Sequence, residues 1–154
     1  MRLVTFTESD QKPRPGALQG DPVVDLSDQI GSIQELIDGG PEFLLSVQDA
    51  LDKAHSQVSL TQVTLLAPIL NPPRIFCLGL AYRDHAIETH QPIPKVPTIF
   101  LKLTSALNGP HSTVVLPKLT QQPDYEAEFA LSSARAGKTF LRIHGRNTSS
   151  VTLS

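Results

Sequence analysis

Thirteen prolines in a chain of 154 residues are the feature that most limits what this sequence can fold into. Proline lacks a backbone donor and breaks the interior of a helix, so an all-helical fold is disfavoured and frequent turns are expected. Pro92, Pro94 and Pro97 exclude regular helix from one stretch, and the NPP sequence at residues 71–73 forms a rigid break. We predict a domain boundary at this break, with an N-terminal module over residues 1–70.

The N-terminal module is expected to combine short strands with two helices. Ser32 followed by Glu35 fits a capping box, and Gly39 with Gly40 fits the end of the same helix. Pro41 suits the first position of a second helix, whose apolar residues recur at helical spacing. The expected strands are Arg2–Phe6, Pro22–Leu26 and Val63–Leu66, and residues 7–21 are expected to form a polar loop. These elements indicate a small α/β module.

The segment after the break contains short apolar runs separated by turn residues. The expected elements are a buried strand at Arg74–Leu80, a short helix at Tyr82–Thr89, and strands at Thr98–Leu101, Thr113–Leu116 and Tyr125–Leu131. The prediction is therefore an α+β chain in which residues 71–138 form a mostly β body. Residues 139–154 have no definable buried face, and we expect a partly disordered tail there.

Charge and cysteine content exclude several classes of function. The formal net charge is −2 and no stretch has the length of a membrane span, so we expect neither nucleic acid nor a membrane as partner. The single cysteine, Cys77, cannot form an internal disulfide and is expected to be a small buried hydrophobe. The first residues contain no apolar signal-peptide core. We expect a cytoplasmic protein, with the mitochondrion as the alternative.

A first candidate site is the pair His85 and Glu88. On a short helix these residues, three positions apart, lie on one face within reach of each other. A carboxylate beside an imidazole orients the ring and raises its basicity, which is what a general base requires. Judged by spacing alone, a solvated helix face explains the pair better.

A second candidate is the pair Glu126 and Glu128, which a strand would place on one face. Their carboxylate oxygens are the ligands that Mg²⁺, Mn²⁺ and Ca²⁺ prefer, although a third ligand is normally needed. The opposite face would carry only apolar residues, which any half-buried strand also does. Lys102 follows a predicted strand and could meet a substrate carboxylate, or it could be an ordinary surface lysine.

Taken in order, these pieces resemble a known family. The stretch RIFCLGLAYRDHAIETHQPIPKVPTIFLKLTSALNGPHSTVVLPKLTQQPDYEAEFAL is similar to the fumarylacetoacetate hydrolase family, and the resemblance runs without a gap over residues 72–131. The preceding MRLVTF and VVDL also resemble the small N-terminal domain of longer members. The resemblance implies a fumarylacetoacetase-type catalytic domain that acts on small oxo or dicarbonyl acids. Such domains hydrolyse C–C bonds, decarboxylate or isomerise, using Mg²⁺ or Mn²⁺, with Ca²⁺ in some members.

Carried onto this sequence, the family motifs imply roles for particular residues. His85 and Glu88 match the catalytic pair, in which the histidine activates water, and Glu126 and Glu128 match the first two metal ligands. Tyr82 and Lys102 are the residues that we expect to contact the substrate. Ala81 stands where the family usually has asparagine, which removes a hydrogen bond beside the site. Family members are often homodimers, but dimerisation in the family uses parts that this sequence lacks, so no dimer is predicted for this chain.

The tail departs from the family pattern. The third metal ligand of the family is an aspartate in a segment resembling GYTVANDVSARD, which in this numbering would fall beyond Ser154. Back-translation of residues 139–154 in a frame shifted by one base, with free choice of synonymous codons, allows the family-like string VSEDPWEEYILGYTV. We therefore expect a truncated domain with an incomplete metal site and a frameshifted or mis-spliced tail. The alternative to an enzyme is a non-catalytic fragment that at most binds a full-length partner.

Overall fold

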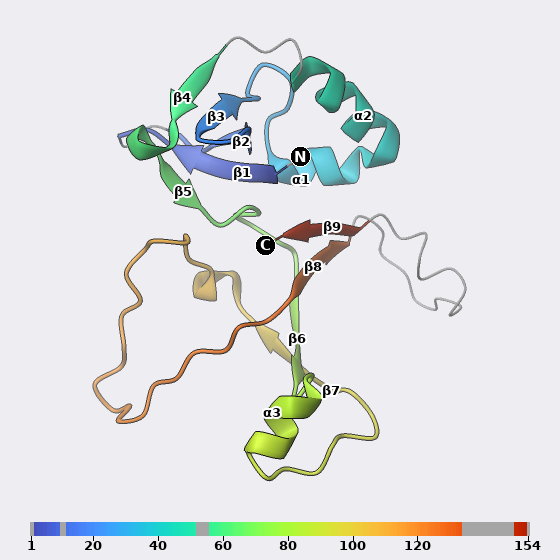
Figure 1. The fold of residues 1–154 in the computed structure, drawn as a ribbon, viewed down its shortest axis with the longest axis vertical. Helices are drawn as coiled ribbons and strands as arrows, with labels where there is room; N and C mark the ends of the chain where they lie inside the picture. Colours follow the sequence, from blue (N-terminus) through green and yellow to red (C-terminus); the bar gives the residue numbers. More distant parts are fainter. Residues whose placement is uncertain (1, 10–11, 52–55, 134–149, 154) are drawn as a thin grey trace. The chain divides into compact units, whose positions relative to one another are not determined.

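The N-terminal sheet is built entirely from antiparallel neighbours. The computed structural model describes residues 2–9, 12–51, 56–133 and 150–153. Five strands pair in the order β4-β3-β2-β1-β5, all antiparallel (Figure 1). Their bounds are β1 Arg2–Thr7, β2 Arg14–Leu18, β3 Pro22–Asp25, β4 Gln57–Ser59 and β5 Thr64–Leu66. The predicted strands at Arg2–Phe6, Pro22–Leu26 and Val63–Leu66 are thus confirmed, whereas β2 and β4 were missed.

The strand β2 lies in the segment for which the sequence predicts a polar loop, because its Pro15 and Gly16 are residues typical of turns. Contacts with neighbouring segments involve both Gly16 and Pro15 of this strand. A Cβ on Gly16 would lie 2.8 Å from Val23 Cγ1 and 2.9 Å from Phe6 Cε1, so only glycine lets these buried side chains pack over β2. The carbonyl of Pro15 accepts a hydrogen bond from the amide of Leu26.

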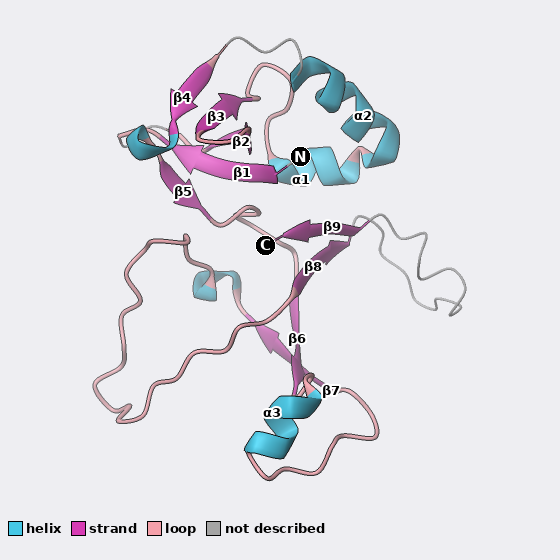
Figure 2. Cartoon of the chain, viewed as in Figure 1, coloured by secondary structure: helices cyan, strands magenta, loops and turns pink. Residues whose placement is uncertain are grey.

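Two helices cover one face of this sheet (Figure 2). The helix α1 spans Ile33–Asp38 and begins as predicted, since the Ser32 hydroxyl accepts from the amide of Glu35 at 3.1 Å. The Glu35 carboxylate in turn accepts from the amide of Gly31 at 2.7 Å. The helix α2 spans Gly40–Leu51 and buries Val47 and Leu51. Together with Ala17, Val24, Leu26, Ile30, Ile33, Leu36 and Ile37 they form the main core.

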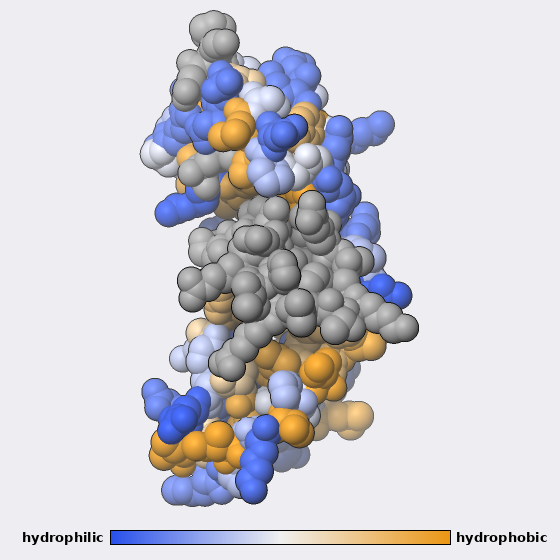
Figure 3. All heavy atoms as spheres, turned by 90° about the vertical axis from the view of Figure 1, so that its right-hand side faces the viewer, coloured by the Kyte–Doolittle hydropathy of each residue, from blue (hydrophilic) through white to orange (hydrophobic). Residues whose placement is uncertain are grey.

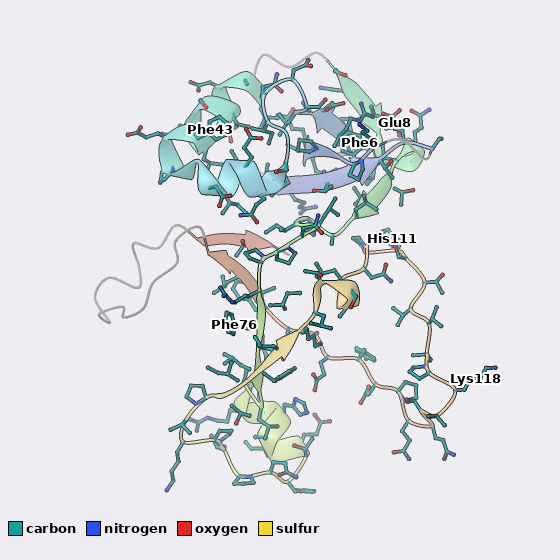
Figure 4. All side chains as sticks on the ribbon, turned by 180° about the vertical axis from the view of Figure 1, so that it is seen from behind. Phe6, Glu8, Phe43, Phe76, His111 and Lys118 are labelled. Atoms are coloured by element: carbon teal, nitrogen blue, oxygen red, sulfur yellow. The ribbon has the colours of Figure 1, made fainter. Side chains whose placement is uncertain are left out.

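The opposite face of the sheet has a smaller cluster made of Val4, Phe6 and Val23. Arg14 lies over the Phe6 ring, 4.9 Å from its centroid, and pairs with the carboxylates of Asp25 and Glu8. Phe6 and Glu8 are labelled in Figure 4. Both clusters come from residues before position 70, so this module has a core of its own.

Residues Leu70–Leu107 form a separate compact unit, whereas the described residues after position 107 group with the N-terminal module. The unit contains β6 (Ile75–Gly79), α3 (Arg83–Glu88) and β7 (Thr98–Lys102), followed by a 3₁₀ turn at Thr104–Ala106. The strands β6 and β7 pair as an antiparallel hairpin. The predicted helix and both predicted strands in this unit are therefore confirmed. The predicted boundaries at residues 70 and 138 stay predictions.

One face of the β6–β7 hairpin is exposed. Phe76 and Leu101 are register partners that are 65% and 64% exposed, and Leu78 and Ile99 are partners that are 48% and 62% exposed. Figure 3 shows hydrophobic atoms at the surface in the lower part of the picture, where this unit lies. The expectation that β6 is buried on both faces was therefore wrong, because no described element covers this face of the hairpin.

The strands predicted after residue 107 are mostly not formed. Residues 113–116 are not a strand, and of Tyr125–Leu131 only Ala130 and Leu131 lie in β8, which spans Ala130–Ser133. A strand needs a hydrogen-bonded neighbour, and none of the described segments pairs with residues 113–116 or 125–129. The expected tail lies outside the described residues except for β9 (Ser150–Leu153), which pairs with β8 and was not predicted.

Candidate functional site

The helix α3 carries the predicted catalytic pair, and its two ends are built differently. At the start, Tyr82 is the N-cap residue but makes no side-chain capping hydrogen bond. At the end, the amide of Gln91 donates to the carbonyl of Ala86 at 2.8 Å and the amide of His90 donates to Ile87 at 3.1 Å. This is a Schellman motif with His90 in the left-handed position, at φ 55°, where glycine is usual.

His85 and Glu88 lie three positions apart on α3, as the sequence predicted. His85 is half-buried and Glu88 is exposed. Ala86, which is fully buried, anchors the helix beside His85. The His85 carbonyl accepts from both the amide and the hydroxyl of Thr89, at 3.0 and 2.7 Å. This holds the backbone of His85 in the last turn of the helix.

The two predicted substrate contacts lie at different places in this unit. Tyr82 is the N-cap residue, three positions before His85, and is 44% exposed. Lys102 pairs with Ile75 and thus lies at the end of the hairpin away from Gly79 and the start of α3. At roughly 3.3 Å per residue, Lys102 is about 13 Å along β7 from the Thr98 end.

Glu126 and Glu128 lie in an irregular, exposed segment of the other unit. Nearby, the Asp124 carboxylate accepts a hydrogen bond from the amide of Tyr125 at 2.8 Å. Among the described residues, no group of three or more His, Cys, Asp or Glu side chains is placed to hold a metal ion. Tyr82, His85 and Glu88 thus lie at the start of α3 or within it, whereas Glu126 and Glu128 belong to the other unit.

Leu80 and His90, which flank α3, were missed by sequence reasoning. Both have positive φ values, 49° and 55°, although neither is glycine. A Gly or Asn at either position would have indicated a left-handed residue, whereas Leu and His give no such signal. Thr89 was placed at the end of the predicted helix, but its double hydrogen bond to His85 was not expected.

The fold and this pair define an α+β protein with an imidazole and a carboxylate on one short helix, an arrangement suited to moving protons. Residues 74–145 match the fumarylacetoacetate (FAA) hydrolase C-terminal family. This match confirms, over residues 74–145, the resemblance to the fumarylacetoacetate hydrolase family that the sequence predicted.

Two named relatives are similar to this chain over most of its length. A Xenopus laevis protein named mitochondrial oxaloacetate tautomerase is 39% identical over 145 residues, which are 90% of this chain and 46% of the relative. A Homo sapiens protein of the same name is 35% identical over 107 residues, which are 70% of this chain and 34% of the relative. The chain thus spans about half the length of the Xenopus relative and about a third of the length of the human one.

Solved structures share the fold. A maleylpyruvate hydrolase from Sphingobium sp. SYK-6, in complex with manganese(II) and pyruvate, has a TM-score of 0.61 and 27% identity over 77% of this chain and 43% of its own. A second structure of maleylpyruvate hydrolase from this source has a TM-score of 0.72 at 22% identity and covers all of this chain and 60% of its own. The predicted α+β class is confirmed, over part of the length of these enzymes.

In the part of the chain that the structure describes, no helix has the length and apolar character needed to cross a membrane.

Proposed function

We propose that this chain contributes the acid–base part of an active site that moves a proton on a small oxo acid. The observation that carries the proposal is the His85–Glu88 pair on α3, inside the segment that matches the fumarylacetoacetate hydrolase family. The names of the Xenopus and human relatives favour tautomerisation of oxaloacetate. The names of the Sphingobium structures favour hydrolysis of an acylpyruvate-like compound. We give tautomerisation preference because the tautomerases are the more similar in sequence.

In this proposal His85 is the base. Its neutral imidazole removes a proton from the carbon beside the substrate carbonyl, and the electron pair of that C–H bond moves onto the carbonyl oxygen. The oxygen then takes up a proton, which completes the change from keto to enol without loss of any atom. Glu88 orients the imidazole and stabilises its protonated form. The half-buried position of His85 limits exchange of that proton with water.

Glu126 and Glu128 are the proposed holders of a divalent metal ion. Their chemistry fits, since both are exposed carboxylates and Mg²⁺ and Mn²⁺ prefer hard oxygen ligands. They supply two protein ligands, and the described residues hold no cluster of three. A bound divalent ion would supply Lewis-acid polarisation of the substrate carbonyl. The manganese(II) ion in the Sphingobium structure supports a divalent metal in this class of site.

A non-catalytic role is the second candidate. The observation in its favour is that the described residues contain no three-ligand cluster. In this role the chain would bind a full-length partner without catalysis. Homodimerisation is a further proposal, which sedimentation velocity tests directly.

The test is the conversion of enol-oxaloacetate to the keto form, followed by the loss of ultraviolet absorbance of the enol. The natural chain should accelerate the conversion above the buffer rate in the presence of Mn²⁺. His85→Gln should lower that acceleration about a hundredfold or more, as loss of a general base does. His111→Gln, which changes an exposed histidine in a separate loop (Figure 4), should leave it unchanged. If the natural chain is no faster than buffer, the non-catalytic role is favoured instead.

Localisation is also a proposal. The relatives are named as mitochondrial, which favours the mitochondrial alternative over the cytoplasmic expectation. Fractionation of cells that express the tagged chain distinguishes the two compartments.

A further inference from the structure

Leu80 has an unusual backbone for its residue type. Its φ is 49°, in the left-handed region that side chains with a Cβ rarely adopt. Among the described residues, the other positive-φ positions apart from glycine are Ser9 and His90. Serine is small, and histidine enters this region more readily than most residues. Leu80 is therefore the one bulky aliphatic residue held in this conformation in the described part of the chain.

The place of Leu80 gives this conformation a consequence for the site. It follows Gly79, the last residue of β6, and it precedes Tyr82, the N-cap of α3. A left-handed residue turns the chain sharply, so its φ sets the direction in which the next segment leaves the strand. The segment that leaves is the helix carrying His85 and Glu88.

The helix α3 is short and has one fully buried residue. It has six residues, Tyr82 makes no side-chain capping hydrogen bond, and Ala86 is the buried residue. A helix of this length gains little stability from its own hydrogen bonds. The anchoring of Ala86 and the connection from β6 through Leu80 therefore contribute to its orientation.

We propose that Leu80 is a positioning residue, and that its left-handed backbone, rather than its side chain, directs the His85–Glu88 pair. This inference rests on the proposed function of that pair. Strained backbone conformations gather at functional sites because the surrounding structure maintains a geometry that the site requires. The leucine side chain is half-buried, so its packing is the competing explanation that an experiment must separate.

Two substitutions separate backbone from side chain. Leu80→Asn removes the aliphatic group but tolerates a positive φ. Leu80→Val keeps an aliphatic group, but its β-branched side chain disfavours a positive φ. The probe is the ring signal of His85 in the ¹³C-labelled chain, measured by NMR with and without the Glu88→Gln change. The movement of this signal on Glu88→Gln reports that the two side chains are close. Unchanged amide signals of the N-terminal module confirm that each variant is folded.

The expected result is that Glu88→Gln moves the His85 signal in the natural chain and in Leu80→Asn, and that this movement is lost in Leu80→Val. Movement that persists in Leu80→Val, or is lost in Leu80→Asn, overturns the proposal and leaves the proposed function intact. If Glu88→Gln does not move the His85 signal in the natural chain, the two side chains are not close. The proposed pair and the proposal about Leu80 are then both wrong. If Leu80→Val does not fold, the Leu80→Asn result still decides. A strong amide–Hα Overhauser effect within residue 80 is also expected, and a weak one contradicts a positive φ.

Discussion

Replacing His90 with glycine should stabilise the end of α3. His90 occupies the left-handed position of the Schellman motif at φ 55°, which costs a residue with a Cβ about 1–2 kcal/mol. Glycine removes that cost but loses about 0.4–1 kcal/mol because it is more flexible in the unfolded chain. The relief of strain is the larger effect, so the net gain should be about 0.5–1 kcal/mol.

Hydrogen exchange measures this gain at the motif itself. The amide of Gln91 donates to Ala86 at 2.8 Å, and its exchange requires the end of the helix to open. A gain of about 0.5–1 kcal/mol should slow this exchange roughly two- to fivefold in His90→Gly.

Thr89→Gly is the matched control, since it carries the same flexibility cost without relief of strain. It also removes the Thr89 hydroxyl, which donates to the His85 carbonyl at 2.7 Å. The control should therefore exchange faster than the natural chain. Faster exchange of Gln91 in His90→Gly as well would refute the reasoning, because the flexibility of glycine would then outweigh the strain at this position.

Two further predictions concern packing. Gly16→Ala should destabilise the N-terminal module by about 1–3 kcal/mol in urea unfolding followed by circular dichroism, because a Cβ would lie 2.8 Å from the buried Val23 side chain. Gly31→Ala, where the added carbon meets only the end of a flexible side chain, should cost much less, and equal losses would count against the packing argument. The double change Phe76→Ser and Leu101→Ser should reduce association in sedimentation velocity, because both side chains are more than half exposed on one face of the hairpin. Association that is unaltered would mean that another surface drives it.

Local signals predicted the helices well. The capping box of Ser32 and Glu35 and the short helix around His85 depend on neighbours within a few residues, which the sequence displays directly. The prediction of a strand at Thr113–Leu116 was wrong because a short run of β-branched and apolar residues only favours a strand, whereas a strand also requires a partner elsewhere in the chain. The strand β2 was missed because Gly16 is locally typical of a turn. Its role in the strand depends on distant residues, since the absence of a side chain leaves room for Phe6 and Val23 of the two neighbouring strands.

The same distinction applies to the site. The spacing of His85 and Glu88 is a property of one helix, so it could be predicted and is observed on α3. The relation of this pair to Glu126 and Glu128 depends on how distant segments pack, which residue spacing does not encode. The left-handed backbone of Leu80 likewise could not be predicted, because leucine gives no signal for a positive φ.

The measurement that tests the central claim most directly is a calorimetric titration of the chain with Mn²⁺. Binding should be lost or strongly weakened in Glu126→Gln and in Glu128→Gln, because each change removes one of two proposed carboxylate ligands. Glu42→Gln, which changes an exposed carboxylate on α2, should bind as the natural chain does. Absence of Mn²⁺ binding in the natural chain, or binding unaffected by the loss of either glutamate, would contradict the account.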